Sequence, residues 1–117
     1  MAKRGDRVAP PPRQGEWEMQ FFTADSARGW EDLCKQARGP TREAWEGISR
    51  DPRGRQNLKR QHPLQGDFAT RLINGVSLEQ WQYEVTGAGR IWYCPDPTEK
   101  IVYVTLAGCG HPNATDC

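Results

Sequence analysis

The last third of the chain constrains the fold most, because it contains three short strand patterns separated by turn signals. Residues 79–86, 90–94 and 101–106 alternate between apolar and polar side chains. A Gly-Ala-Gly segment at 87–89 separates the first two patterns, and a Pro-Asp-Pro segment at 95–97 separates the last two. Period-two alternation bounded by glycine and proline is typical of strands joined by hairpins. The sequence therefore predicts antiparallel strands in this region.

One strand and two helices are expected in the first half of the chain. Residues 17–21 alternate and predict a first strand. A helix capped by Asp25 or Ser26 follows, and a second helix capped by Thr41 comes after an interruption at residues 39–40. The apolar residues at helical spacing are Trp30, Leu33, Cys34 and Ala37 in the first helix and Ala44, Trp45 and Ile48 in the second.

The order of these elements predicts the fold class. Residues 68–73 form a further strand pattern, and Asn74-Gly75 is a hairpin signal because both positions tolerate positive φ. We expect an α+β fold with an N-terminal strand, a two-helix hairpin and then an antiparallel sheet of about four strands, in two layers with the helices on one face. Residues 1–15 are charged and proline-rich and are expected to be a flexible tail, with residues 16–117 as one domain.

The charge of the chain is unevenly distributed. The net charge is only +1, but the segment 50–71 holds many bases and only two acids, Asp51 and Asp67. Its bases are Arg50, Arg53, Arg55, Lys59, Arg60 and Arg71, together with His62. A basic block in a neutral chain indicates a local anionic partner, while a solvated, flexible loop is the competing interpretation.

Membrane and metal functions are not expected from this sequence. No apolar run is long enough to span a bilayer, and Lys3 and Arg4 precede no apolar stretch of a secretory signal, so a cytoplasmic location is expected. No two cysteines form a Cys-x-x-Cys pair. A site made of Cys109, His111 and Cys117 would match no zinc spacing. We therefore expect neither a metal nor another cofactor.

One arginine and two histidines are the candidates for chemistry. Arg90 begins the middle strand of the last third, His111 follows the last strand, and His62 lies in the basic segment. Metal-independent RNA cleavage needs a base for the ribose 2′-hydroxyl, a cation for the charge that builds on phosphorus, and an acid for the departing 5′-oxygen. Arginine suits the cationic role because its planar fork binds two phosphate oxygens, and histidine suits the acid or base role.

Each candidate has a simpler interpretation. Arg90 can pair with Glu84 or Asp96 across a hairpin, although exposed ion pairs of this kind contribute only about 0–1 kcal/mol. Both histidines precede a proline and can be solvated turn residues. Trp92 and Tyr93 fit core or sheet packing, and a role as base-stacking platforms requires that they be exposed. The alternation places Arg90 and Trp92 on the polar face of the sheet.

Three segments together carry a resemblance to a known family. They are Pro63-Leu-Gln-Gly66 after the basic loop, Gly89-Arg-Ile-Trp-Tyr93, and Lys100-Ile-Val-Tyr-Val104 before the last histidine. With the strand and helical hairpin upstream, they resemble the RelE/ParE superfamily of toxins from bacterial type II toxin–antitoxin systems, over about residues 17–116. The resemblance implies a RelE-like two-layer fold. It also implies an endoribonuclease that cleaves mRNA in the ribosomal A site without a metal and so inhibits translation.

The resemblance also assigns roles to residues. Arg90 matches the arginine that stabilises the transition-state phosphate, and His111 is similar in placement to a C-terminal catalytic histidine or tyrosine. His62 occupies a loop position where some members carry a carboxylate base, so either histidine can be the general base. The residues expected to bind RNA are Lys59, Arg60 and Arg71, with Arg55 of the same loop. The implied partners are mRNA, the ribosome and a cognate antitoxin protein.

The sequence also departs from the family pattern. It lacks a tyrosine at its extreme C-terminus, and Pro-Asn-Ala-Thr follows His111. The ParE branch shares the fold, lacks the ribonuclease residues and targets DNA gyrase. The alternatives are therefore a ParE-like gyrase inhibitor or a non-catalytic member that binds nucleic acid or protein. The presence of both Arg90 and His111 favours RNA cleavage.

Overall fold

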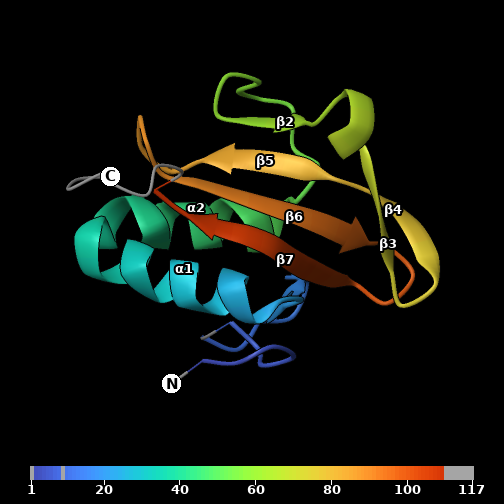
Figure 1. Ribbon diagram of the computed structural model, residues 1–117, viewed down its shortest axis with the longest axis horizontal. Coiled ribbons are helices and arrows are strands. Elements are labelled where there is room, and N and C mark those ends of the chain that lie inside the picture. The colour runs from blue at the N-terminus through green and yellow to red at the C-terminus, as the bar shows by residue number, and fades with distance from the viewer. Residues whose placement is uncertain (1, 9, 110–117) are drawn as a thin grey trace.

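A five-stranded mixed sheet is the centre of the computed structural model, which describes residues 2–8 and 10–109 of the 117. The strands lie in the order β1-β7-β6-β5-β2 (Figure 1). Their bounds are β1 Glu18–Phe21, β2 Gln61–Pro63, β5 Trp81–Glu84, β6 Arg90–Asp96 and β7 Ile101–Gly108. β1 is parallel to β7, and the other neighbours are antiparallel. The four strands of this sheet that follow the helices in sequence are antiparallel, as predicted. The direction of the N-terminal strand was not predicted, because alternation encodes faces and not strand direction.

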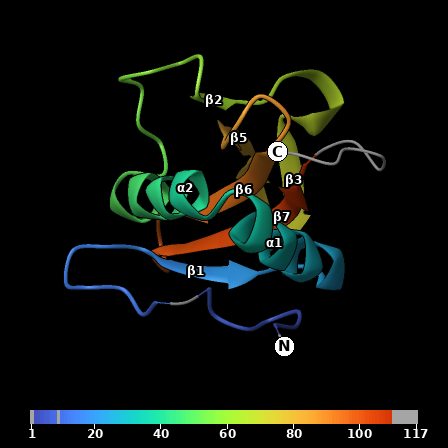
Figure 2. The same cartoon turned by 90° about the vertical axis from the view of Figure 1, so that its left-hand side faces the viewer.

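Two helices, α1 (Ala24–Gln36) and α2 (Arg38–Arg50), cover one face of this sheet (Figures 1 and 2). The α+β class and the layer of helices against a sheet are as predicted. The helices bury their apolar sides against the sheet, in a core that includes Leu33, Ile48, Trp81, Ile91, Tyr93, Val102 and Val104. Within the described residues, no helix combines the length and the apolar character needed to span a bilayer.

The helix ends differ from the sequence expectation. Thr23 caps α1 and forms a capping box with Ser26, so neither Asp25 nor Ser26 is the N-cap. Pro40 lies in the first turn of α2, where its missing N–H costs no helical hydrogen bond. Thr41 does not cap α2, because its hydroxyl donates to the Leu33 carbonyl at 3.1 Å inside the helical layer.

A glycine allows α1 to approach β7 closely. A Cβ atom on Gly29 would lie 1.7 Å from the carbonyl oxygen of Ala107, which is far inside van der Waals contact. Only a residue without a side chain fits there, so the sheet and the first helix are held at a backbone-to-backbone distance. This contact fixes the position of the C-terminal half of β7 relative to α1.

A separate β-hairpin covers part of the face opposite the helices. β3 (Thr70–Ile73) and β4 (Val76–Glu79) form a two-stranded sheet of their own. Asn74 and Gly75 both have positive φ, of 50° and 86°, which confirms the predicted turn. The expectation that residues 68–73 belong to the main sheet is wrong, because the hairpin packs across that sheet. A second small core, made of Ile73, Leu78 and Cys94 with Phe22 and Tyr103 against it, fills the contact.

The N-terminal segment is attached to the sheet over the residues that the structure describes there. Val8 is buried in the main core, and its N–H donates to the Met19 carbonyl at 2.8 Å. The N–H groups of Gly5 and Phe21 bond the carbonyls of Phe21 and Asp6, at 2.7 and 3.0 Å. In contrast to the expected tail, residues 2–8 line β1, because one apolar side chain and several backbone groups find partners there.

Candidate functional site

A row of three side chains crosses the sheet on the face away from the helices. His62 on β2 lies opposite Gln82 on β5, and Gln82 lies opposite Trp92 on β6. Directly paired residues of antiparallel strands share a face. The neighbours Trp81 and Tyr93 point into the helix-covered core instead. The open face therefore carries an imidazole, an amide and an indole side by side.

Arg90 belongs to the next row on the same face. It lies opposite Glu84 on β5 and opposite Gly108 on β7. His62 on β2 and Arg90 on β6 have β5 between them, and Arg90 lies two residues along β6 from Trp92. With ordinary sheet dimensions, their Cα atoms are about 12 Å apart. Both side chains are long enough to approach one group bound between them.

Hydrogen bonds join the three side chains of the first row into a chain. The Trp92 Nε1–H donates to Gln82 Oε1 at 2.9 Å. Gln82 Nε2 lies 3.4 Å from His62 Nε2, and His62 Nδ1 lies 3.1 Å from the Pro63 carbonyl oxygen. The imidazole is thus held at both ring nitrogens, and it is half-buried.

The Arg90 side chain takes part in none of the ion pairs found among the described residues. Glu84 is its neighbour across the hairpin, but the two side chains do not pair. Asp96 lies at the other end of β6, opposite Ile101. The simpler interpretation of Arg90 as half of an ion pair is therefore wrong for both acids. Arg90 is half-buried, and a guanidinium without an acidic partner is a group that can bind an anion.

An exposed phenylalanine lies against Trp92. Phe68 ends a short 3₁₀ helix, η1 (Gly66–Phe68), and its ring centroid is 5.1 Å from that of Trp92. Phe68 is 56 % exposed, which is unusual for so large an apolar side chain. Sequence reasoning placed Phe68 in a strand and missed it. Tyr93 is buried in the core, so only Trp92 of the predicted aromatic pair faces the open side.

Gln80 holds Phe68 in this position. Its buried amide Nε2 donates to the Phe68 carbonyl at 3.0 Å, and its Oε1 accepts from the Thr105 hydroxyl at 2.6 Å. Thr105 lies at a bulge in β7, because Leu106 pairs with Trp92 while Val104 pairs with Tyr93. The bulge thereby links η1 to the middle of the sheet.

Two of the predicted RNA-binding residues make contacts that hold the basic loop. The Arg60 guanidinium donates to the carbonyls of Glu84 and Val85 at 3.2 and 3.4 Å. The Arg55 guanidinium lies over the Trp81 ring, 5.3 Å from its centroid. Both side chains are exposed, as is Lys59, so their positive charges still face solvent at the β2 side of the sheet.

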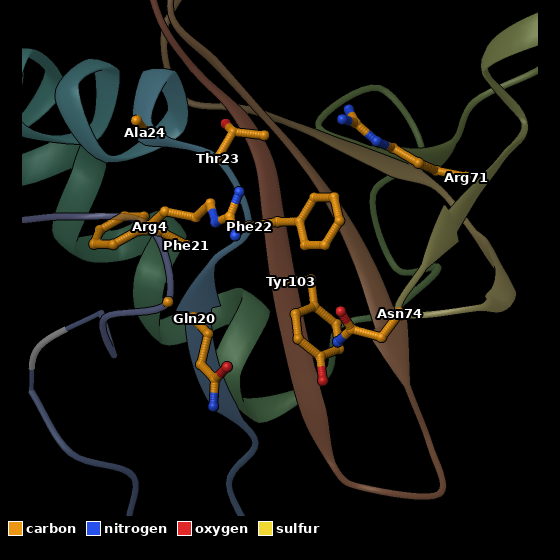
Figure 3. Close-up of a pocket in the computed structure, with 10 residues that line it drawn as sticks. Arg4, Gln20, Phe21, Phe22, Thr23, Ala24, Arg71, Asn74 and Tyr103 are labelled. Carbon is orange, nitrogen blue, oxygen red and sulfur yellow. The ribbon is translucent and has the colours of Figure 1, made fainter.

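Arg71 lies elsewhere, on the hairpin. Its guanidinium lies over Phe22 at 5.3 Å and borders a surface cavity of about 550 Å³ between β1, the hairpin and the N-terminal segment. Figure 3 shows Phe22 and Tyr103 projecting into this space, with Arg71 on the hairpin side and Arg4 on the opposite side. A second cavity, of about 270 Å³, extends from Arg71 to Leu106, the partner of Trp92. Arg71 is thus apart from Arg90, but a hollow surface leads from it to the open face.

Thiol chemistry finds no support among the cysteines at 34 and 94. Burial raises the pKa of Cys94 to about 12, and the nearby Arg71 charge offsets this only in part. Burial and then the Glu31 charge raise the pKa of Cys34. Both thiols therefore stay protonated near neutral pH, and a thiolate is the form that acts as a nucleophile.

His111 lies outside the described residues, so its expected approach to Arg90 stays a prediction. Within the described part of the chain, no three His, Cys, Asp or Glu side chains gather as ligands for a metal ion. Comparison with protein-family models, with curated proteins and with solved structures finds no match. The assignment of a function therefore depends on the geometry of the open face.

Proposed function

We propose that this protein is a toxin with a RelE-like fold that cleaves mRNA on the ribosome without a metal and so inhibits translation. The observation that carries the proposal is the common face of His62, Arg90 and Trp92. This face combines an acid–base group, an anion-binding cation and an aromatic platform. The first two groups serve metal-independent cleavage of RNA as a proton-transfer group and as the cation for the transition-state charge, and the third suits the binding of a single strand.

The reaction is a transfer of the phosphoryl group within RNA. A histidine removes the proton of the ribose 2′-hydroxyl, the 2′-oxygen attacks phosphorus, and the bond to the 5′-oxygen breaks. The products are a 2′,3′-cyclic phosphate and a 5′-hydroxyl, after the second histidine donates a proton to the departing oxygen. Arg90 binds the non-bridging oxygens, where negative charge builds in the transition state. His62 and His111 share the two proton-transfer roles.

Several contacts suit this face to an RNA strand. Phe68 and Trp92 offer a ring surface on which a base can stack, and such stacking contributes about 1–3 kcal/mol per base. Lys59 is exposed in the loop before β2, and Arg71 lies beyond Leu106 on the other side. Arg55 and Arg60 instead contact Trp81 and Tyr83, whose side chains belong to the helix-covered core. A phosphate backbone on the open face would meet the charge of Arg90 and, at the hairpin end, that of Arg71.

The order of elements supports the RelE-like assignment. A strand, two consecutive helices and a run of strands follow one another, and the helices cover one face of the sheet while the β3–β4 hairpin covers only part of the other. In the family resemblance, a cognate antitoxin covers the basic surface of such a toxin. We propose mRNA, the ribosome and an antitoxin encoded nearby as the partners of this protein.

Mapping of mRNA 5′ ends after brief induction tests the proposal. We expect new ends within translated regions, produced also by purified protein with programmed ribosomes in the presence of EDTA. Arg90→Ala and His62→Ala should abolish the new ends while circular dichroism and thermal unfolding remain close to wild type. If both variants cleave at the wild-type rate, the assignment of the site is wrong.

The same experiment separates the two alternative functions. Intact mRNA together with a DNA-damage response would instead indicate a gyrase inhibitor. Salt-dependent RNA binding without cleaved ends would indicate a non-catalytic member of the fold, because phosphate contacts release counterions. Either result would overturn the nuclease proposal.

A further inference from the structure

The hydrogen-bonded chain of Trp92, Gln82 and His62 has a direction that is fixed by its first donor. An indole nitrogen can only donate a hydrogen bond. The Gln82 oxygen must therefore be the atom that faces Trp92 at 2.9 Å. This orientation turns the Gln82 NH₂ group towards His62 Nε2, 3.4 Å away.

The direction of the chain determines which imidazole nitrogen carries the proton. A nitrogen that faces an NH₂ group has to accept, so His62 Nε2 is unprotonated. The other nitrogen, Nδ1, lies 3.1 Å from the Pro63 carbonyl oxygen, which can only accept. Nδ1 therefore carries the proton and donates it to this carbonyl. All three contacts agree on one neutral tautomer, with its free electron pair at Nε2.

We propose that Gln82 is a positioning residue that keeps His62 in the Nδ1–H tautomer and thereby makes it the general base. This inference rests on the proposed function, and it assigns the base role to His62 rather than to His111. The 3.4 Å contact is long for a hydrogen bond, so a ribose 2′-hydroxyl can replace the Gln82 amide at Nε2. The Pro63 carbonyl keeps the tautomer during this exchange.

Protonation of His62 conflicts with the same chain. An imidazolium would present an N–H at Nε2 to the NH₂ group of Gln82, and rotation of the amide would break its bond to Trp92. The other charged residues on the elements around His62 are Arg60, Glu84 and Arg90 on the sheet and its edge and Asp67 in η1. Gln82 differs from all of these in touching the ring nitrogen directly.

Long-range ¹H–¹⁵N correlation spectra of the full-length protein test the tautomer without any need for activity. We expect wild-type His62 to show a protonated Nδ1 and an unprotonated Nε2 in its neutral form. Gln82→Glu replaces the NH₂ group by an acceptor, so it should shift His62 to a protonated Nε2. Gln65→Glu is the matched control, because it adds the same charge nearby at an exposed side chain without a capping contact, and it should keep the wild-type tautomer.

Cleavage rates of the same variants then connect the tautomer to catalysis. A carboxylate at position 82 favours the protonated imidazole, so the acidic limb of the kcat/KM profile should move to higher pH. A shift of one pH unit lowers the rate on that limb about tenfold. Gln65→Glu should leave the profile unchanged. If Gln82→Glu does not fold, Trp92→Phe serves instead, since loss of the indole N–H frees the amide to rotate and should give a mixture of His62 tautomers.

The possible failures can be told apart. A protonated Nε2 in the neutral wild-type imidazole would overturn the inference, as would a wild-type tautomer or pH profile in Gln82→Glu. A confirmed tautomer in a protein that never cleaves RNA would overturn the proposed function and leave the hydrogen-bonded chain intact. If His62→Ala abolishes cleavage but Gln82→Glu leaves the cleavage rate and its pH profile unchanged, only the role of Gln82 is overturned.

Discussion

Arg90 and Glu84 lie directly opposite each other on β6 and β5, and yet the described residues include no ion pair between them. Opposite charges that do pair across strands contribute about 0.2–1 kcal/mol. The arginine therefore adds little to the stability of the hairpin. Its charge remains available to a ligand on the open face.

Arg90→Ala should consequently separate stability from activity. We expect the free energy of unfolding in urea to change by less than about 1 kcal/mol. The rate of RNA cleavage should fall by about 10²–10³-fold, the usual cost of removing one group that stabilises transition-state charge. Arg90→Lys should recover only part of the rate, because an ammonium lacks the planar fork. A loss of stability above about 2 kcal/mol would instead assign Arg90 a structural role.

Phe68→Ser should weaken RNA binding without unfolding the protein. Phe68 is 56 % exposed, so its replacement removes a stacking surface and little core packing. We expect a loss of about 1–3 kcal/mol in the binding of a short single-stranded RNA, measured by fluorescence anisotropy at fixed salt. Leu72→Ser is the matched control, since Leu72 is 67 % exposed on the hairpin. Equal losses in both variants would rule out a specific platform at Phe68.

Tyr93 should make the protein less stable at alkaline pH. Burial, the largest cause, raises the pKa of Tyr93 well above its ordinary value of 10.0, so the folded state keeps the proton that the unfolded state loses. The contribution of this shift to the free energy of unfolding is complete below about pH 10. Above that pH it is lost, by at most about 1.4 kcal/mol per pH unit. Urea unfolding at several pH values between 8 and about 11 measures this slope.

The variant Tyr93→Phe provides the comparison. The Tyr93 hydroxyl donates to the Pro52 carbonyl at 2.8 Å and accepts from Gln61 Nε2 at 2.9 Å, so its removal should cost about 1–3 kcal/mol at neutral pH. The difference in the free energy of unfolding between wild type and Tyr93→Phe should shrink above about pH 10, because only the wild type has the titrating Tyr93 hydroxyl and loses its stabilisation. Tyr83 and Cys94, whose pKa values burial also raises, are common to both proteins. A difference that stays constant with pH would contradict the assignment.

Gly29→Ala should be strongly destabilising, and Gly87→Ala should not. The new Cβ at position 29 would lie 1.7 Å from the Ala107 carbonyl oxygen, so α1 and β7 would have to separate. Overpacking of this kind costs about 1–3 kcal/mol or more. At position 87, between β5 and β6, a Cβ meets no atom of a non-neighbouring residue within 4 Å and φ is not positive, so alanine fits there without strain. Thermal unfolding of the pair should show a fall in Tm for the first variant alone.

The sequence by itself determined the local structure where one residue type or one short period is sufficient. Asn74 and Gly75 specify their turn because both adopt positive φ. Alternation placed Arg90 and Trp92 on one face of β6, away from the buried Ile91 and Tyr93. Periodic apolar residues gave both helices, although the capping residues were wrong for each.

Only the tertiary structure decided how distant segments meet. β2 is three residues long and includes a proline, so no alternation marks it, and yet its pairing with β5 brings His62 to Gln82. The direction of β1 beside β7 and the packing of the β3–β4 hairpin across the sheet depend on contacts between segments far apart in the chain. Local periodicity records which side of a strand is buried, but strand register and direction arise from the pairing of whole elements. The hydrogen-bonded chain at the candidate site exists because three strands align at one position.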